Sequence, residues 1–337
     1  MYIETKEYTG SEYMYHPDSN LDFFLDGVTY DKVGVIDIEA TGLSPAKSNF
    51  ILGGILTYTK EGCIVTQYFA ENLREEKQAL YAYLDHISKL DVIITYNGKH
   101  YDIKYLKGRM ADLQVLTDFV FPYNLDLYLF VNGHSSLRKL LPNLKQKTLE
   151  NFMGLWSSRT DEISGGESVE LYREYLLRPT NELRSTILLH NSDDVLQLSK
   201  LLPVMKKLDM EGGFYKQGFP AGGFFVQKIG IDARELKISG YQRKPMAYHA
   251  YGLDDSPCII DLEGFSGEFY ISLPLTKRQG LTIVDTRAID YDFSDLEVYN
   301  NYGSGLLAVK TGDEVNKREV IHFVKLLLNR VEELIHQ

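Results

Sequence analysis

The chain has 337 residues, and hydrophobic residues make up 44% and charged residues 25% of it, which is typical of globular domains and excludes a disordered chain or a fibre. Asp and Glu outnumber Lys and Arg by 47 to 36, which excludes a polycation that coats nucleic acid but is compatible with a local basic groove. The two cysteines, Cys63 and Cys258, have no CxxC partner, which argues against a zinc ribbon or a disulfide scaffold and fits a reducing cytosol.

The N-terminal twenty residues contain neither a basic start nor an apolar core, so the sequence predicts no signal peptide. No apolar run approaches the ~18–20 residues needed to span a bilayer. We therefore expect a soluble, cytoplasmic protein without a membrane partner. The 24 tyrosines are interpreted mainly as packing residues.

The N-terminal two thirds alternate between strand and helix patterns. Residues 1–30 are polar and aromatic and are expected to form an N-terminal extension or an edge strand. Apolar runs typical of buried strands occur at Val33–Ile38, Ile51–Tyr58, Cys63–Phe69, Val92–Tyr96 and Leu125–Phe130. Helical spacing of apolar residues predicts helices at Glu75–Leu90 and Tyr101–Leu113, and residues 135–208 are expected to be helical throughout. This order predicts an α/β domain over residues 31–210, with a mixed sheet flanked by helices.

The composition changes after this domain. Gly occupies positions 212, 213, 218, 222 and 223, and this predicts a Gly-rich linker over residues 211–223. Residues 224–337 are expected to form a smaller, β-rich α+β accessory domain. Its predicted elements are strands at Leu236–Tyr241, Cys258–Leu262, Glu268–Leu273 and Leu281–Thr286 and a final helix from Glu314 to Ile335.

Two carboxylates close the first predicted strand, in the run Ile36-Asp37-Ile38-Glu39-Ala40-Thr41-Gly42-Leu43. Residues two apart on a strand point to the same side, so Asp37 and Glu39 are expected side by side. At the end of a buried strand they repel each other and lose solvation, and a divalent cation between them removes both penalties. The alternative is that this common pattern lies on a solvated face.

Further acidic residues are predicted on helices. Asp102 follows Tyr96-Asn97-Gly98-Lys99-His100-Tyr101 and falls in the first turn of a helix, where the helix dipole also favours an ordinary structural Asp. On the helix expected from residue 181, His190 and Asp194 share the apolar stripe, whereas Asp193 falls off it and is expected to be solvated. A polar pair on such a stripe indicates either a functional site or a buried hydrogen bond that holds the helix in place.

The three motifs occur in order as D-I-E-A-T-G-L, N-G-K-H-Y-D-x-x-x-L and H-N-S-D-D-V-x-x-L, and on these the sequence resembles the DEDD superfamily of metal-dependent 3′–5′ exonucleases. The resemblance implies a ribonuclease-H-like fold, for which the predicted element order is typical. It also implies that Asp37, Glu39, Asp102 and Asp194 bind two Mg²⁺ or Mn²⁺ ions and that His190 is the general base. Superfamily members with His carry it five residues before the last Asp, and members with Tyr carry it four before, so His190 has the Tyr spacing.

Within the superfamily, the sequence is most similar to the YprB-like predicted exonucleases over about residues 30–205. The stretches that support this similarity are Leu125–Tyr128, Lys147–Gly154 and Asp161–Ser168. The substrate implied is nucleic acid, either DNA or RNA, entering as a single-stranded 3′ end. Two alternatives stay open, namely a structure-specific endonuclease and a non-catalytic nucleic-acid-binding module on the same fold.

The residues expected to contact the substrate share either a place in the motifs or a positive charge. They are Thr41, Gly42, Leu43, Asn97, Lys99, Arg138, Lys139, Lys145 and Lys147. Because no acidic residue lies between Tyr128 and Leu149, the last four form a basic cluster expected to meet backbone phosphates. A second basic group is expected beside Asp102, and it consists of Lys99, Lys104, Lys107 and Arg109. In the C-terminal region, Lys237, Arg243, Lys244, Lys277 and Arg278 are candidates to extend the same surface.

Overall fold

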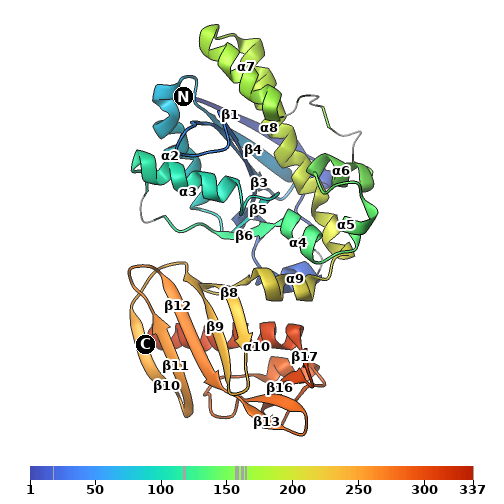
Figure 1. Ribbon diagram of the computed structural model, residues 1–337, viewed down its shortest axis with the longest axis vertical. Coiled ribbons are helices and arrows are strands. Elements are labelled where there is room, and N and C mark those ends of the chain that lie inside the picture. The colour runs from blue at the N-terminus through green and yellow to red at the C-terminus, as the bar shows by residue number, and fades with distance from the viewer. Residues whose placement is uncertain (18, 117–118, 156–158, 161–162, 164, 337) are drawn as a thin grey trace. The chain divides into compact units, whose positions relative to one another are not determined.

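The computed structural model describes residues 1–17, 19–116, 119–155, 159–160, 163 and 165–336. The chain divides into two compact units, of which the first comprises residues 1–19 and 28–208 and the second comprises residues 20–27 and 209–337 (Figure 1). Across the described residues, no helix is both long enough and apolar enough to cross a membrane.

The first unit is built on a six-stranded mixed sheet with the order β1-β4-β3-β2-β5-β6. Its strands are β1 (Tyr2–Thr9), β2 (Val33–Ala40), β3 (Phe50–Tyr58), β4 (Gly62–Phe69), β5 (Val92–Thr95) and β6 (Tyr123–Asp126). The first four in this order pair antiparallel, whereas β2, β5 and β6 run parallel to one another. The ends of β2, β5 and β6 therefore meet at one edge of the sheet, which is where ligand sites of α/β sheets form.

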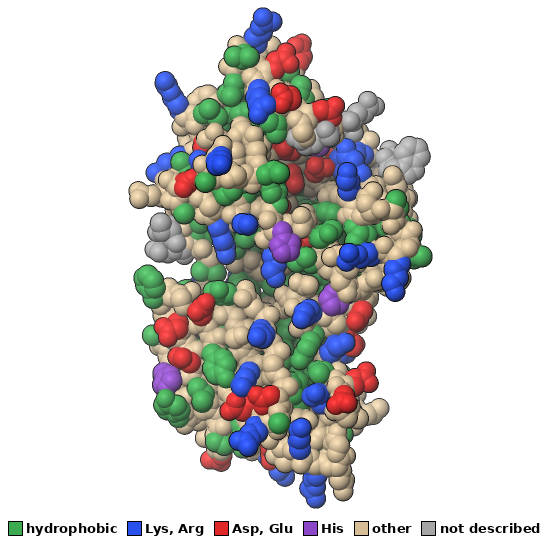
Figure 2. All heavy atoms as spheres, viewed as in Figure 1, with side chains coloured by type: hydrophobic (Ala, Val, Ile, Leu, Met, Phe, Trp, Pro, Cys, Tyr) green, Lys and Arg blue, Asp and Glu red, His purple; other side chains and the backbone are tan. Residues whose placement is uncertain are grey.

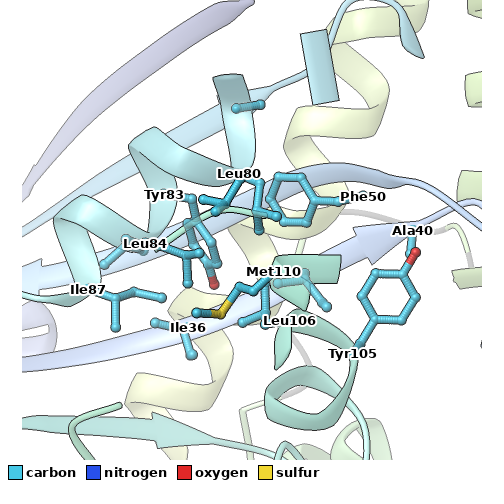
Figure 3. Close-up of a cluster of buried hydrophobic side chains, with 14 of the residues drawn as sticks. Ile36, Ala40, Phe50, Leu80, Tyr83, Leu84, Ile87, Tyr105, Leu106 and Met110 are labelled. Atoms are coloured by element: carbon cyan, nitrogen blue, oxygen red, sulfur yellow. The ribbon is translucent and has the colours of Figure 1, made fainter. Parts of the chain in front are cut away.

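Helices cover both faces of this sheet (Figure 1). One face packs against α2 (Glu76–Ile87) and α3 (Asp102–Leu113), and the other packs against α7 (Gly165–Leu177) and α8 (Asn181–Leu201). Figure 3 shows the first of these cores, in which side chains of α2, α3 and the strands interlock. Each Leu or Ile buried there contributes roughly 1.5–3 kcal/mol, so these layers hold the sheet edge rigid.

Two predictions about the first unit differ from the structure. The strand predicted at Leu125–Phe130 ends at Asp126, because the Asp126 carboxylate accepts a hydrogen bond from the Leu129 amide (3.4 Å) and caps a new helix, α4 (Leu127–Gly133). Residues 135–208 are not one helical run. They contain α5 (Leu137–Leu140), α6 (Gln146–Phe152), α7 and α8, with loops between them.

The N-terminal segment is part of both units. The edge strand expected within residues 1–30 is confirmed as β1, which pairs along its whole length with β4. Residues 20–27 belong to the second unit, where α1 (Ser19–Phe24) brings Phe24 onto Phe214 with ring centroids 4.5 Å apart. A separate N-terminal extension is therefore not what the structure shows.

The stretch predicted as a Gly-rich linker is folded. It forms α9 (Met210–Gln217) and β7 (Phe219–Ala221), and the compact unit already begins at Asp209. The Asp209 carboxylate accepts a hydrogen bond from the Gly212 amide (2.9 Å) and so caps α9. The glycines thus lie at the start of a helix and at places where other groups approach the backbone closely, and they do not form a flexible connection.

The second unit is rich in antiparallel strands, as expected. One sheet has the order β10-β11-β12-β9-β8-β7, and another joins β13, β14, β16 and β15, with β17 paired to β16. The strands after β7 are β8 (Phe224–Ile231), β9 (Glu235–Gln242), β10 (Tyr248–Leu253), β11 (Ser256–Leu262), β12 (Glu268–Pro274), β13 (Thr276–Arg278), β14 (Leu281–Asp285), β15 (Tyr302–Gly303), β16 (Leu306–Thr311) and β17 (Glu314–Val315). The final helix, α10 (Lys317–Ile335), begins later than predicted because residues 314–315 are in β17.

Candidate metal centre

Strand β2 carries Asp37 and Glu39 to the edge of the sheet where the parallel strands end. The pairing of β2 with β3 shifts register between Glu39 and Ala40, because Ile51 of β3 is an extra residue in the ladder directly after the second carboxylate. Bulges of this kind re-aim side chains and are frequent beside functional sites. Both carboxylates line a cavity of about 800 Å³.

Asp37 is held in place by an amide that the sequence did not mark as functional. The Asn191 Nδ2 donates to Asp37 Oδ2 (2.9 Å), and Gln67 Nε2 in turn donates to Asn191 Oδ1 (2.9 Å). Asn191 reaches Asp37 only because Gly54 lies opposite, since a Cβ on Gly54 would come within 2.1 Å of the Asn191 Oδ1. The glycine pair inside β3 was the available signal, because Gly within a strand often marks a close approach of another group.

Helix α3 begins with Asp102, as predicted. This carboxyl is buried, and its Oδ1 has no hydrogen-bond partner among the described residues. Burial, as the largest influence, raises the Asp102 pKa to about 7. A buried carboxylate oxygen without a donor is destabilising unless another positive group completes the site.

Helix α8 supplies His190 and Asp194, one turn apart on its cavity-facing side. The His190 Nε2 lies 3.6 Å from Glu39 Oε1 and 3.7 Å from Asp194 Oδ2. Ligand atoms of Glu39, His190 and Asp194 all lie within 4.8 Å of one another, so these three residues could hold a metal ion. The prediction that Asp193 is solvated is wrong. Asp193 is buried, and its carboxylate accepts hydrogen bonds from the Thr160 amide (2.6 Å) and hydroxyl (2.7 Å).

Arg159 is the second residue that sequence reasoning missed. Its guanidinium is nearly buried and contacts Asp194 Oδ1 (2.7 Å) and both carboxylate oxygens of Glu150 (2.8 and 3.0 Å). Arg159 therefore balances part of the negative charge of the cluster. No periodic pattern marks it, because it comes from a loop and its partner Asp194 lies on α8, later in the chain.

The electrostatics of the cluster are those of crowded carboxylates. Burial, followed by the negative charges of Asp194, Asp102 and Glu39, raises the Asp37 pKa well above its usual range. Burial also raises the Glu39 pKa to about 7, while neighbouring His190 acts in the opposite direction. A divalent cation relieves this repulsion, and oxygen ligands are those that Mg²⁺ and Mn²⁺ prefer. The donor set and the unpartnered Asp102 oxygen thus fit such ions.

The residues expected to bind substrate fall into three groups. Thr41, Gly42, Leu43, Lys145 and Lys147 line the same cavity as Asp37 and Glu39. A second cavity, of about 640 Å³, is lined by Asn97, Arg138 and again Lys145. Lys99 and Lys139 are exposed and line neither cavity.

Two other residues of the expected basic groups form ion pairs within the protein. Arg109 is buried against Glu76 and takes no part in a basic surface beside Asp102. In the second unit, Lys237 pairs with Asp232 (2.9 Å) and Glu235 (3.2 Å). Figure 2 shows Lys and Arg side chains interspersed with Asp and Glu on the visible face, so positive charge is not confined to one patch there.

Comparison with known proteins identifies the family. A family model described as the RNase_H superfamily matches residues 35–206, just over half of the chain. The protein therefore belongs to the RNase_H superfamily, and its mixed six-stranded sheet with flanking helices is the corresponding fold. No curated protein matches the sequence.

Solved structures give weaker likenesses. A family B DNA polymerase from the hyperthermophilic archaeon Pyrobaculum calidifontis is 19% identical with a TM-score of 0.40, and the match covers 52% of this chain and 24% of the polymerase. Exonuclease I is 12% identical with a TM-score of 0.34, and the match covers 62% of this chain and 55% of the exonuclease. The chain thus spans about a quarter of the polymerase and about half of the exonuclease. The family assignment rests on the family model.

The raised carboxyl pKa values predict how the metal-free protein responds to pH. A carboxyl group of ordinary pKa near 4 in the unfolded chain, but near 7 in the folded protein, binds more protons in the folded state between these values. The free energy of unfolding must therefore fall as the pH rises from about 4 to about 7. We expect the melting temperature in chelator to drop over this range, and Mn²⁺ to raise it more at pH 8 than at pH 5.

The double variant Glu39→Gln/Asp102→Asn is the control, because other groups also titrate over this range. Its melting temperature should depend less on pH than that of the wild type, and Mn²⁺ should no longer raise it. An equal pH dependence in both proteins would show that these carboxyls do not carry the effect.

Proposed function

We propose that this protein is a metal-dependent 3′–5′ exonuclease that hydrolyses phosphodiester bonds of nucleic acid. The observation that carries the proposal is the convergence of carboxylates from β2, α3 and α8 on one cluster, in which burial and mutual repulsion raise the pKa values of Asp37, Glu39 and Asp102. Such a cluster is unfavourable for a merely structural site, because carboxylates brought together away from water repel one another and lose solvation. The three sequence motifs and the superfamily membership support the same interpretation.

In this proposal Asp37, Glu39, Asp102 and Asp194 hold two Mg²⁺ or Mn²⁺ ions. Ions in such a site supply the positive charge that lowers the pKa of a water molecule and stabilises a leaving oxygen. The Asn191 amide fixes the orientation of the Asp37 carboxylate, and Arg159 fixes that of Asp194. Lys145 and Lys147, on the cavity wall, are placed to contact backbone phosphates.

His190 acts in this proposal as the general base. It lines the cavity between Glu39 and Asp194, and a neutral imidazole accepts a proton at pH values near 7. Its spacing of four residues from Asp194 puts it one helical turn away, on the same face of α8. Both cavity-facing residues are therefore presented by one rigid element.

Substitution of His190 shows whether this residue acts as a general base or as a metal ligand. We expect His190→Ala to lower the rate of hydrolysis by about 10²–10⁴-fold, the usual contribution of a general base, and to leave Mn²⁺ affinity largely unchanged. His190→Tyr should retain more activity than His190→Ala, because the spacing is that of superfamily members with Tyr. The measurements are the initial rate and a calorimetric Mn²⁺ titration. Loss of Mn²⁺ affinity in His190→Ala would make His190 a ligand instead.

The proposed function is tested with 5′-labelled single-stranded DNA and RNA in Mn²⁺. A ladder that shortens from the 3′ end is the expected result, and the preferred substrate shows whether DNA or RNA is hydrolysed. Internal cuts would point to an endonuclease. Binding without any cleavage would contradict catalysis and favour a nucleic-acid-binding module.

A further inference from the structure

The second cavity of the first unit has the composition of a nucleotide site. Its volume of about 640 Å³ is within the range of small-molecule pockets. Its described lining residues include two tyrosines, four side-chain amides and two cations but no acidic residue, although the chain as a whole is acidic. Among them are Tyr96, Tyr128, Arg138, Leu144, Lys145 and Gln146.

The two tyrosines form the aromatic part of the cavity. The ring centroids of Tyr96 and Tyr128 are 5.8 Å apart and the ring planes meet at 68°, close to a T-shaped pair. The Tyr96 hydroxyl donates to the carbonyl of Leu144, another residue of the cavity lining, so the position of that ring is fixed. In a T-shaped pair the edge of one ring covers at most one face of the other, so Tyr128 keeps at least one face that Tyr96 does not cover, and such a face in a polar pocket suits a nucleobase.

This cavity adjoins the candidate metal centre. Lys145 and Gln146 line both cavities, and Gln146 Nε2 donates to the main-chain oxygen of Asp194 (3.1 Å). A strand whose scissile phosphate lies at the carboxylates can therefore continue past Lys145 into the second cavity. Arg138, which is exposed and lines the second cavity, provides a charge for another phosphate of that strand.

We propose that this cavity is a nucleotide subsite, in which a base of the substrate strand upstream of the scissile phosphate stacks on Tyr128 while Arg138 contacts its backbone. The proposal rests on the proposed function for the position of the strand. Stacking is tolerant of base identity, since every base presents a ring face, so the subsite serves to hold the strand rather than to read its sequence.

Binding of a fluorescent single-stranded oligonucleotide to the full-length protein tests the subsite, with Ca²⁺ in place of Mn²⁺. Tyr128→Leu should raise the Kd by about 5–150-fold, as expected for the loss of one stacked base. The matched control is Tyr81→Leu on α2, whose side chain is exposed and lines neither cavity; its Kd should stay unchanged. An abasic nucleotide at one position should weaken binding to the wild type but not to Tyr128→Leu.

A second variant keeps the test decisive if Tyr128→Leu fails to fold. Arg138→Gln alters an exposed side chain and should lower the slope of log K against log salt by about 0.7, the value for one phosphate contact on a single strand. Equal Kd values for Tyr128→Leu and Tyr81→Leu would overturn the proposal, as would an unchanged salt slope in Arg138→Gln if Tyr128→Leu is unfolded. Failure of the wild type to bind the strand would also overturn it.

Two further measurements distinguish the strand subsite from the proposed nuclease activity and from a site for a free mononucleotide. Hydrolysis of bis(p-nitrophenyl) phosphate by the wild type in Mn²⁺ reports on the proposed function alone, because this diester has no nucleobase. A free nucleoside 5′-monophosphate that binds the wild type but not Tyr128→Leu, while strand affinity is equal in both, would assign the cavity to a mononucleotide and overturn the strand subsite.

Discussion

The variant Asp102→Asn is expected to lose Mn²⁺-dependent hydrolysis by at least about 10³-fold, because the metal contributes several kcal/mol to the transition state and each 1.36 kcal/mol is one factor of ten. At the same time its metal-free form should melt at a higher temperature than the wild type. Asp102 is buried with one oxygen unpartnered, and the substitution removes one charge from a repelling cluster. Activity assays and thermal melts in chelator measure the two effects.

The same loss of activity is expected for Asp37→Asn, Glu39→Gln and Asp194→Asn, but the thermal response should differ. Asp194→Asn removes one of the two charged partners of Arg159, so its metal-free form should melt at a lower temperature. The matched control is Asp193→Asn, whose carboxylate bonds Thr160 and does not line the cavity. Near-normal turnover in any of the four variants would remove that residue from the metal centre.

The candidate ligand positions on β2 and α8, and the sheet that carries them, could be located from the sequence because both leave local patterns. The spacing of Asp37 and Glu39 on a buried strand and of His190 and Asp194 on a helix defines which side chains share a face. The structure brings Glu39, His190 and Asp194 within 4.8 Å of one another. The order of strands and helices also predicted the mixed sheet that places them.

The supporting residues could not be predicted because their roles depend on partners far away along the chain. Asn191 bonds Asp37 across 154 positions and Arg159 reaches Asp194 from a loop, and neither pairing leaves a periodic signal. The break after Asp126 was missed because a capping hydrogen bond outweighs the apolar run that follows it. Similarly, α9 forms through an Asp209 cap in a stretch whose glycines suggested a linker.

Arg109 illustrates how long-range pairing changes the meaning of a charge. In the sequence, Arg109 lies near Lys104 and Lys107, which suggests a basic surface. In the structure, its Nε and Nη2 instead donate hydrogen bonds to the two carboxylate oxygens of Glu76 (2.8 and 2.9 Å). Glu76 also accepts the Phe50 amide (2.7 Å), and Arg109 Nη1 donates to the Pro45 carbonyl (2.8 Å). The pair thus fastens the loop after β2, which includes the cavity residues 41–43, to α2 and α3.

Removal of the Arg109 guanidinium should therefore lower the free energy of unfolding. We expect Arg109→Met to lower the free energy of unfolding by about 3–5 kcal/mol, because it leaves the buried Glu76 carboxylate without its charged partner. Arg109→Lys should recover only part of the loss, since an ammonium cannot form the two-point contact. The control is Arg173→Met, which breaks an exposed Arg–Glu pair with Glu170 and should cost under about 1 kcal/mol. Urea denaturation of the three variants measures these differences, and equal losses for Arg109→Met and Arg173→Met would show that the buried pair does not anchor the loop.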